Sequence, residues 1–174
     1  MSEETSVILR EAIPDDSQAL LSMMRQAGKE TDFLVVDEEG LLLSPEHLAI
    51  ELGYLYESEN NLLLVAVEGT KIIGVASIKA ESRFRVSHIG EVGISILKEY
   101  WGLGLGTMLL EETIYWAEKS GVLFRLELDV QVRNERAIHL YRKAGFEIEA
   151  RMARGVRTDE GVFLDVYKMS RLIG

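Results

Sequence analysis

Three glycines at alternate positions stand between a strand-like run and an amphipathic helix, within residues 101–107. Gly102, Gly104 and Gly106 let the backbone adopt positive φ and let a ligand reach main-chain N–H groups with no Cβ in the way. Apolar side chains then recur at the spacing of one helix face, at Leu105, Met108, Leu109 and Trp116. The free N–H groups and the positive dipole end of that helix point back at the loop. The segment therefore predicts a binding site for a phosphate-bearing ligand.

The composition is typical of a globular protein, with 47% hydrophobic and 28% charged residues. The 174 residues suffice for one domain, which we expect to span residues 1–174. The longest apolar run, residues 62–67, is too short to cross a bilayer, so we expect no membrane partner. The start of the chain lacks the apolar core of a signal peptide, and the chain has no cysteine. These features predict a cytoplasmic protein that uses neither disulfides nor thiolate chemistry.

The charge balance narrows the class of partner. Nineteen basic and twenty-nine acidic residues give a formal net charge of −10, which repels a phosphodiester backbone, so we expect no nucleic-acid partner. The same field would attract a cationic substrate. Acidic proteins are common, however, and net charge constrains association more than chemistry.

Periodicity and turn residues predict the element order β-α-α-β-β-β-α-β-α-β-β. Ser44 and Pro45 suit the N-cap and the first position of the second helix, and Gly145 suits the C-terminal cap of the last. The strands before the glycine loop resemble an antiparallel meander, since residues 68–70 carry a hairpin signal. The expected strands are residues 7–10, 61–67, 71–78, 88–96, 123–130, 147–154 and 163–170, and the expected helices are residues 14–28, 44–55, 105–120 and 134–144.

Two nucleotide-binding templates fail at the glycine loop. A P-loop requires Gly-Lys-Ser/Thr after the glycines, which is absent. A dinucleotide fingerprint requires a third glycine where this chain has Thr107, although Glu127 and Asp129 lie about where a ribose-binding acid belongs. That fingerprint also needs an opening βαβ unit, whereas three meander-like strands precede this loop. A nicotinamide-dependent oxidoreductase is therefore a minor alternative.

Three blocks of sequence carry a resemblance to a known family: residues 91–96 (EVGISI), 100–106 (YWGLGLG) and 134–146 (NERAIHLYRKAGF). In this order and at this spacing they resemble the GNAT superfamily of acetyl-CoA-dependent N-acetyltransferases. The resemblance covers nearly the whole chain. It implies an α/β (α+β) GNAT fold with a mixed central sheet of about seven strands, in which the fourth and fifth strands splay apart.

The resemblance implies where acetyl-CoA, the expected cosubstrate, would bind. The family pattern is Gln/Arg-x-x-Gly-x-Gly/Ala, and its loop binds the diphosphate through backbone amides. Gly104 and Gly106 match the pattern, while Trp101 replaces Gln or Arg, which alters a side-chain interaction and leaves the amide cradle intact. The expected acetyl-CoA-binding residues are Ile94, Ser95, Ile96, Gly102, Leu103, Gly104, Leu105, Gly106, Thr107, Asn134, Ile138 and Tyr141.

By the same resemblance, the fourth strand exposes main-chain groups of Ile94 and Ile96 to the pantetheine arm, and an N–H near Ile94 faces the thioester oxygen. Asn134 and Tyr141 are seven residues apart, so they share one helix stripe with Ile138. Asn134 can equally be a plain N-cap. Tyr141 is expected to be the general acid that protonates the departing thiolate, the alternative being a core aromatic with a wet hydroxyl.

The attacking amine must lose a proton, since amines of this kind have a pKa of about 8 to 10.4. Glu91 resembles the strand carboxylate that many family members use as the base, directly or through water. The alternative is an ordinary strand glutamate or a substrate anchor. His88 is a second candidate base, whereas His47 and His139 are expected on the surface. No two histidines have the spacing of metal ligands, so we expect no metal.

The sequence leaves the acceptor open. Five acidic residues between the first two helices either attract a cationic amine or form a solvated loop: Glu30, Asp32, Asp37, Glu38 and Glu39. Residues 159–165, with Met169, resemble the subgroup that acetylates ribosomal-protein N-termini and polyamines. The resemblance implies acetyl transfer to a primary amine by direct attack in a ternary complex, and it raises a homodimer as an expectation. The alternative is a non-catalytic acyl-CoA-binding or sensing module on the same fold.

Overall fold

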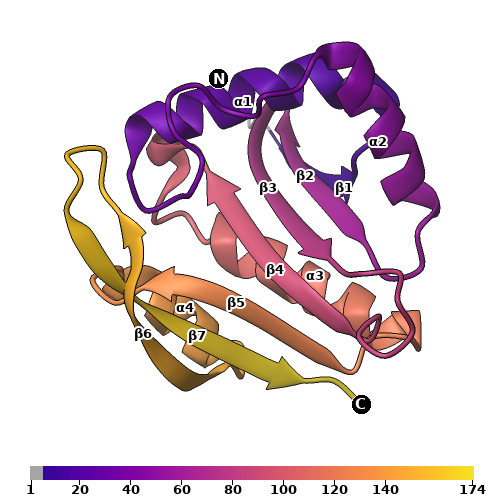
Figure 1. Ribbon diagram of the computed structural model, residues 1–174. Coiled ribbons are helices and arrows are strands. Elements are labelled where there is room, and N and C mark those ends of the chain that lie inside the picture. Colours follow the sequence, from indigo (N-terminus) through magenta and orange to yellow (C-terminus); the bar gives the residue numbers. More distant parts are fainter. Residues whose placement is uncertain (1–5) are drawn as a thin grey trace.

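A computed structural model describes residues 6–174 and shows one seven-stranded sheet with helices on both faces (Figure 1). The strand order is β1-β2-β3-β4-β5-β7-β6. The strands are β1 (Val7–Glu11), β2 (Leu62–Glu68), β3 (Lys71–Lys79), β4 (Ile89–Ile96), β5 (Arg125–Gln131), β6 (Glu147–Arg157) and β7 (Phe163–Leu172). The helices are α1 (Ser17–Glu30), α2 (Pro45–Glu57), α3 (Leu105–Ser120) and α4 (Glu135–Lys143). This element order is the predicted one.

Two apolar clusters lie on opposite faces of the sheet. The first cluster packs α3 and α4 against one face and includes Leu64, Ile78, Leu109, Leu126 and Met169. The second cluster packs α1 and α2 against the other face and includes Leu20, Met23, Leu52, Val65 and Val75. Alternate residues of the inner strands therefore enter different clusters, as the period of two in a strand requires.

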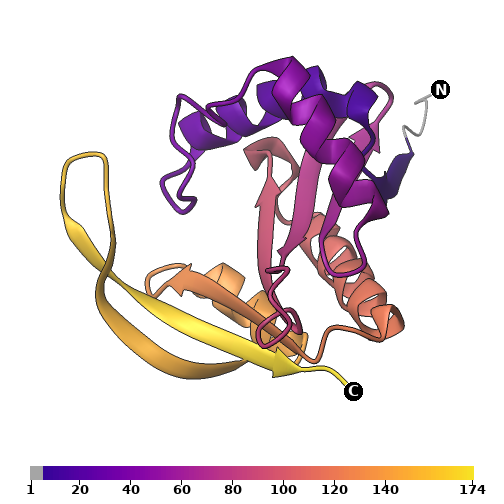
Figure 2. The ribbon, with the colours of Figure 1, turned by 45° about the vertical axis from the view of Figure 1, so that its right-hand side comes forward.

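All neighbouring strands are antiparallel except β4 and β5, which run parallel. Their pairing covers only residues 89–91 of β4 against residues 125–127 of β5. Beyond Glu91 the two strands diverge, and Figure 2 shows the sheet opening into two arms, with β1 to β4 in one arm and β5 to β7 in the other. The predicted splay of the fourth and fifth strands is confirmed.

The helix ends follow the turn chemistry of the sequence. The Ser44 side chain accepts a hydrogen bond from the His47 amide at 3.2 Å, and Pro45 occupies the first turn of α2. Gly121 and Gly145 follow α3 and α4 with φ of 68° and 89°, as left-handed caps do. Among residues 6–174, every helix is too short or too polar to cross a membrane.

Some boundaries and faces differ from the expectation. Residues Pro14–Asp16 form a short 3-10 helix, so α1 begins only at Ser17. Strand β5 begins at Arg125 rather than at residue 123. Met108, expected on the buried face of α3, is 47% exposed, because that face centres on Leu109 and Leu110.

Candidate active site

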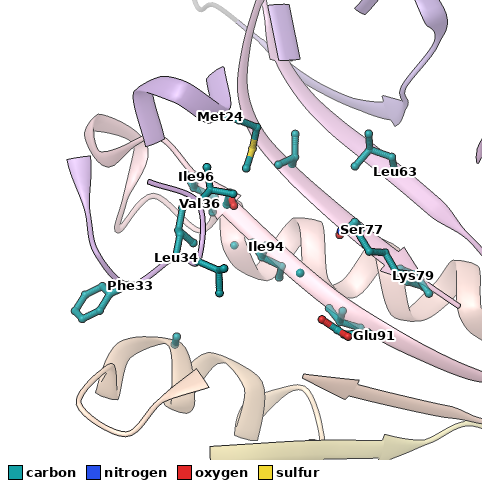
Figure 3. A pocket seen from close by; sticks show the side chains of 18 of the residues that line it. Met24, Phe33, Leu34, Val36, Leu63, Ser77, Lys79, Glu91, Ile94 and Ile96 are labelled. Atoms are coloured by element: carbon teal, nitrogen blue, oxygen red, sulfur yellow. The ribbon is translucent and has the colours of Figure 1, made fainter. Parts of the chain in front are cut away.

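A cavity of about 1240 Å³ opens where β4 and β5 separate. One part, here called the donor half, is formed by the end of β4, residues 101–107 and α4. The other part, here called the acceptor half, lies under α1, α2 and the loop between them, residues 31–44. Figure 3 shows this half, with Met24, Leu34 and Val36 near one end and Glu91 at the other.

The cavity gathers ten of the twelve residues expected to bind acetyl-CoA. They are Ile94, Ser95, Ile96, Gly102, Gly104, Leu105, Gly106, Thr107, Asn134 and Tyr141. Leu103 does not line the cavity and its side chain is 71% exposed. Ile138 does not line it either, because its side chain is buried in the first cluster. Both can still support their neighbours in the loop and on α4.

The free edge of β4 presents main-chain groups to the cavity. The Leu97 amide donates to the Ile73 carbonyl at 3.0 Å, so odd-numbered residues of this segment exchange hydrogen bonds with β3. The N–H and C=O groups of Ile94 and Ile96 therefore point away from β3, where β5 is no longer paired. The Ile96 carbonyl accepts a hydrogen bond from the Trp101 indole. The other main-chain groups of this edge can add an extended chain, as the pantetheine arm requires.

The glycine loop leaves amides free at its far end. Gly102 and Gly104 have φ of 77° and 83°, values that favour glycine. The first hydrogen bond of α3 joins the Met108 amide to the Gly104 carbonyl, so the preceding amides at residues 105–107 have no partner within the helix. A Cβ at Gly106 would lie 3.2 Å from the Leu140 side chain, so this glycine lets α3 approach α4 closely. The predicted anion cradle therefore has the backbone geometry that a diphosphate needs.

Two residues outside the expected set shape this cradle. The indole Nε1 of Trp101 donates to the Ile96 carbonyl at 2.8 Å, which joins the loop to the end of β4. The guanidinium of Arg136 lies 5.9 Å from the centroid of the Trp101 ring, and both side chains line the cavity. Sequence reasoning noted Trp101 only as a departure from the family pattern. Arg136 was missed, although it lies within one of the blocks that carry the resemblance.

Asn134 is an N-cap and also lines the cavity. Its side-chain oxygen accepts a hydrogen bond from the Ala137 amide at 3.3 Å, at the start of α4. Its amide nitrogen stays available as a donor, so the two functions that the sequence left open are compatible.

Tyr141 lies under the donor half with its ring buried against Phe146, at a centroid distance of 6.0 Å. Among residues 6–174 no side-chain polar atom is both sealed from solvent and without a hydrogen-bond partner. The Tyr141 hydroxyl, for which we find no partner in this part of the chain, therefore opens into the cavity that the residue lines. Burial raises the pKa of Tyr141 to about 12, so the phenol stays protonated at neutral pH. A protonated phenol in a cavity can serve as a proton donor.

Glu91 lies at the last position of β4 that pairs with β5, opposite Glu127, and in register with Lys79 on β3. Its side chain is exposed and lines the cavity on the α1 and α2 side of the sheet, together with Ser77 and Lys79 (Figure 3). Although burial lowers the pKa of Lys168, hydrogen bonding to Asp129 and the charges of Glu127 and Glu91 raise it overall. Glu91 thus belongs to a charged rim at the point where the sheet divides.

The histidines take different positions. His88, the second candidate base, is half-buried and does not line the cavity. His47 and His139 are exposed as expected, but His139 lies at the cavity wall. Within residues 6–174 no group of three or more His, Cys, Asp or Glu side chains is arranged to hold a metal ion.

The acceptor half is closed by residues 31–44, and contacts with β5 and the turn that follows it hold this loop. Gln131 donates to the Asp32 carbonyl at 2.7 Å, and Arg133 forms an ion pair with the Asp32 carboxylate at 2.7 Å. Arg133 also stacks over Phe33 at 5.2 Å. None of the five acidic residues that the sequence singled out lines the cavity. The loop presents apolar side chains instead, namely Phe33, Leu34, Val35, Val36, Leu41 and Leu43.

A family model described as the Acetyltransferase (GNAT) family matches residues 25–146. The chain belongs to the GNAT family. It is an acetyltransferase that uses acetyl-CoA, the donor of this family, and the donor half has the amides and free strand edge that such a donor fits.

Curated GNAT relatives differ in their acceptors. The chain is 27% identical to the L-amino acid N-acetyltransferase AaaT of Escherichia coli, over 97% of this chain and 99% of the relative. It is 30% identical to the spermidine N(1)-acetyltransferase of Escherichia coli, over 62% of this chain and 59% of the relative.

Solved GNAT structures share the fold closely. An acetyltransferase of the GNAT family from Streptococcus pneumoniae superposes with a TM-score of 0.94 at 46% identity, over 97% of this chain and all of that one. A phosphinothricin acetyltransferase from Sinorhizobium meliloti, solved in complex with acetyl-CoA, has a TM-score of 0.82 at 22% identity, over 97% of this chain and 89% of that one. The mixed seven-stranded GNAT fold is therefore confirmed.

Proposed function

We propose that this GNAT acetyltransferase transfers the acetyl group of acetyl-CoA to the primary amine of a small molecule or a protein N-terminus, by direct attack in a ternary complex. The observation that carries the proposal is one cavity that joins a free β4 edge and an amide cradle to a separate, mostly apolar acceptor half. Donor and acceptor fit there together, so no covalent acyl-enzyme is required. Holding both reactants in line supplies a large part of the rate enhancement.

Acetyl-CoA supplies an activated acetyl thioester when bound. The free amides at residues 105–107 would bind its diphosphate, and main-chain groups of Ile94 and Ile96 would bind its pantetheine amides. The N–H of Ile94 would stabilise negative charge on the thioester oxygen as the amine attacks. This arrangement depends on backbone atoms, so it tolerates the substitution of Trp101 at the family's Gln or Arg position.

Glu91 and Tyr141 would manage the protons. Glu91 takes a proton from the ammonium group, directly or through water, so that the nitrogen lone pair can attack the carbonyl carbon. A C–N bond forms and the C–S bond breaks. Tyr141 gives its hydroxyl proton to the departing thiolate. The nitrogen loses its second proton as the amide forms, and that proton passes through solvent to restore the Tyr141 phenol, while Glu91 releases the first proton to solvent. Burial keeps Tyr141 protonated at neutral pH, which supports this assignment.

The acceptor half favours an amine that carries an apolar group. Leu63 and Met24 line it together with the apolar side chains of residues 31–44, whereas the acidic residues of that loop lie outside. Lys79 lies in register with Glu91 on the neighbouring strand, where it suits an acceptor carboxylate. An apolar amino acid combines these features, and a relative is named an L-amino acid N-acetyltransferase. A polyamine, by contrast, would place its further ammonium groups among these apolar side chains, although Glu51, Glu91 and Asp129 also line the cavity. A cytoplasmic location and a homodimer stay predictions.

Release of free thiol from acetyl-CoA tests this proposal. The panel contains leucine, phenylalanine, phenethylamine, spermidine and an N-terminal peptide. We expect kcat/KM to be about 10-fold or more higher for the apolar amines than for spermidine. Binding of acetyl-CoA without turnover of any amine would instead support the non-catalytic module. Competition by NADH for the cavity would support the oxidoreductase alternative.

A further inference from the structure

We propose that Arg136, held in place by Trp101, is a phosphate-binding residue that pairs with the diphosphate of the donor. This inference rests on the proposed function, because it assumes that acetyl-CoA occupies the donor half. It assigns to α4 a charged contact that the glycine loop does not supply by itself.

The position of Arg136 is the first argument. A Cβ placed on Gly102 would meet Nη2 of Arg136 at 2.9 Å, so the guanidinium lies directly on the first glycine of the loop. Arg136 is exposed on the first turn of α4, and it lines the same cavity as the free amides of residues 105–107. A planar guanidinium with five donors matches phosphate oxygens in a bidentate manner.

The charge of Arg136 is the second argument. Arg133, which stacks over Phe33 at the cavity wall, pairs with Asp32. Within residues 6–174 we find no carboxylate that pairs with Arg136. A free guanidinium beside an amide cradle, in a chain of net charge −10, is a local positive site suited to an anion.

Trp101 explains how a flexible side chain is kept there. Its indole N–H is fixed by the Ile96 carbonyl at 2.8 Å, so the ring has a defined orientation between β4 and the loop. The ring then offers Arg136 a stacking surface at 5.9 Å. Trp101 therefore acts as a positioning residue, and together the two side chains supply the polar contact that the family pattern places at position 101.

The test is the dissociation constant of CoA, measured by calorimetry for the wild type, Arg136→Ala, Arg136→Lys and Trp101→Leu. Arg142→Ala is the matched control, because Arg142 is an exposed arginine of the same helix that does not line the cavity. We expect Arg136→Ala to weaken binding about 10-fold, Arg136→Lys to recover part of the loss, and Arg142→Ala to change little. Trp101→Leu should weaken binding about 2- to 5-fold.

Two further measurements identify the phosphate contacted. Dephospho-CoA lacks the 3′-phosphate but keeps the diphosphate. The ratio of the dissociation constants of Arg136→Ala and wild type should therefore be the same for CoA and dephospho-CoA. The ratio should also fall as ionic strength rises from about 0.05 to about 0.5 M, because salt screens an exposed ion pair. Equal binding by Arg136→Ala and wild type, or a ratio near one with dephospho-CoA, would overturn the inference. Failure of the wild type to bind CoA at all would instead reject the proposed function.

Discussion

Gly28→Ala should separate the acceptor half of the cavity from the donor half. Gly28 lies on α1, and a Cβ there would lie 1.7 Å from the Asp37 carbonyl oxygen and 2.4 Å from its carbon. Ordinary van der Waals contact begins near 3.4 Å, which is twice the distance from this Cβ to the Asp37 oxygen. The loop of residues 31–44 would therefore have to move away from α1. The loop cannot absorb this shift locally, because Leu34, Val36 and Leu41 pack against the second cluster.

The magnitude follows from two opposing effects. A clash this close lies at the upper end of the range of about 1–3 kcal/mol that forced repacking costs. The helix propensity of alanine offsets about 1 kcal/mol, so the net loss is about 1–2 kcal/mol. Gly53→Ala on α2 is the matched control, since a Cβ there would lie at an unstrained 3.9 Å from Pro14 Cγ. We expect Gly28→Ala to lower the melting temperature by about 2–8 °C and Gly53→Ala to raise it by a few degrees.

Calorimetry and kinetics together give the assay. Gly28→Ala should raise KM for the amine while the Kd of CoA stays near the wild-type value, because the donor half lies on other elements. If Gly28→Ala were as stabilising as Gly53→Ala, or if CoA binding weakened along with amine binding, the packing argument would be refuted.

Three further predictions concern the chemistry and the stability of the chain. Tyr141→Phe should lower kcat about 10²-fold or more with little change in CoA affinity, and an unchanged kcat would remove Tyr141 from the mechanism. Because the pKa of Tyr141 is about 12, wild-type activity should show no loss from ionisation of this phenol up to about pH 10. Glu91→Gln should lower kcat by about 10²-fold with CoA binding retained, and full activity in this variant would reject Glu91 as base. Asp16→Asn should lower the free energy of unfolding by about 1–2 kcal/mol at pH 7, because it removes the negative charge and one of the two oxygens that accept hydrogen bonds from Arg10 at 2.7 and 2.8 Å. Arg10 lowers the pKa of Asp16, so the wild type should exceed Asp16→Asn in free energy of unfolding by the full amount above the ordinary carboxylate pKa of about 4. Urea titrations at lower pH should show this difference vanish as Asp16 is protonated. A difference that persists in acid would contradict the role of the ion pair.

The sequence predicted most of the fold because local chemistry specifies its elements. Helix ends are examples: Ser44 and Pro45 begin α2, and Gly145 follows the end of α4. Each acts through a hydrogen bond or a φ value that involves only residues close in sequence. The splay of β4 from β5 came from the resemblance, since no local pattern encodes where a parallel pair stops.

The donor half was largely predictable and the acceptor half was not. The proposed donor contacts are backbone groups of a short segment, which the spacing of glycines indicates. The apolar wall of residues 31–44 depends on long-range contacts, such as Gln131 and Arg133 with Asp32, which a single sequence does not show. The acidic residues of that loop drew attention because charge is visible in sequence, whereas the apolar side chains between them face the cavity.

Met108 illustrates a different limit. Met108 fits the helical period of α3. The buried face of the helix is, however, centred on Leu109 and Leu110, so Met108 stays exposed. Which of two adjacent stripes is buried depends on the tertiary packing of the helix.

The most direct test of the whole account is a crystal structure of this protein with acetyl-CoA bound. We expect the diphosphate against the amides of residues 105–107 with Arg136 beside it, and the pantetheine arm along the free edge of β4 at Ile94 and Ile96. A donor bound with its diphosphate away from the glycine loop, or with its pantetheine arm off β4, would contradict the account.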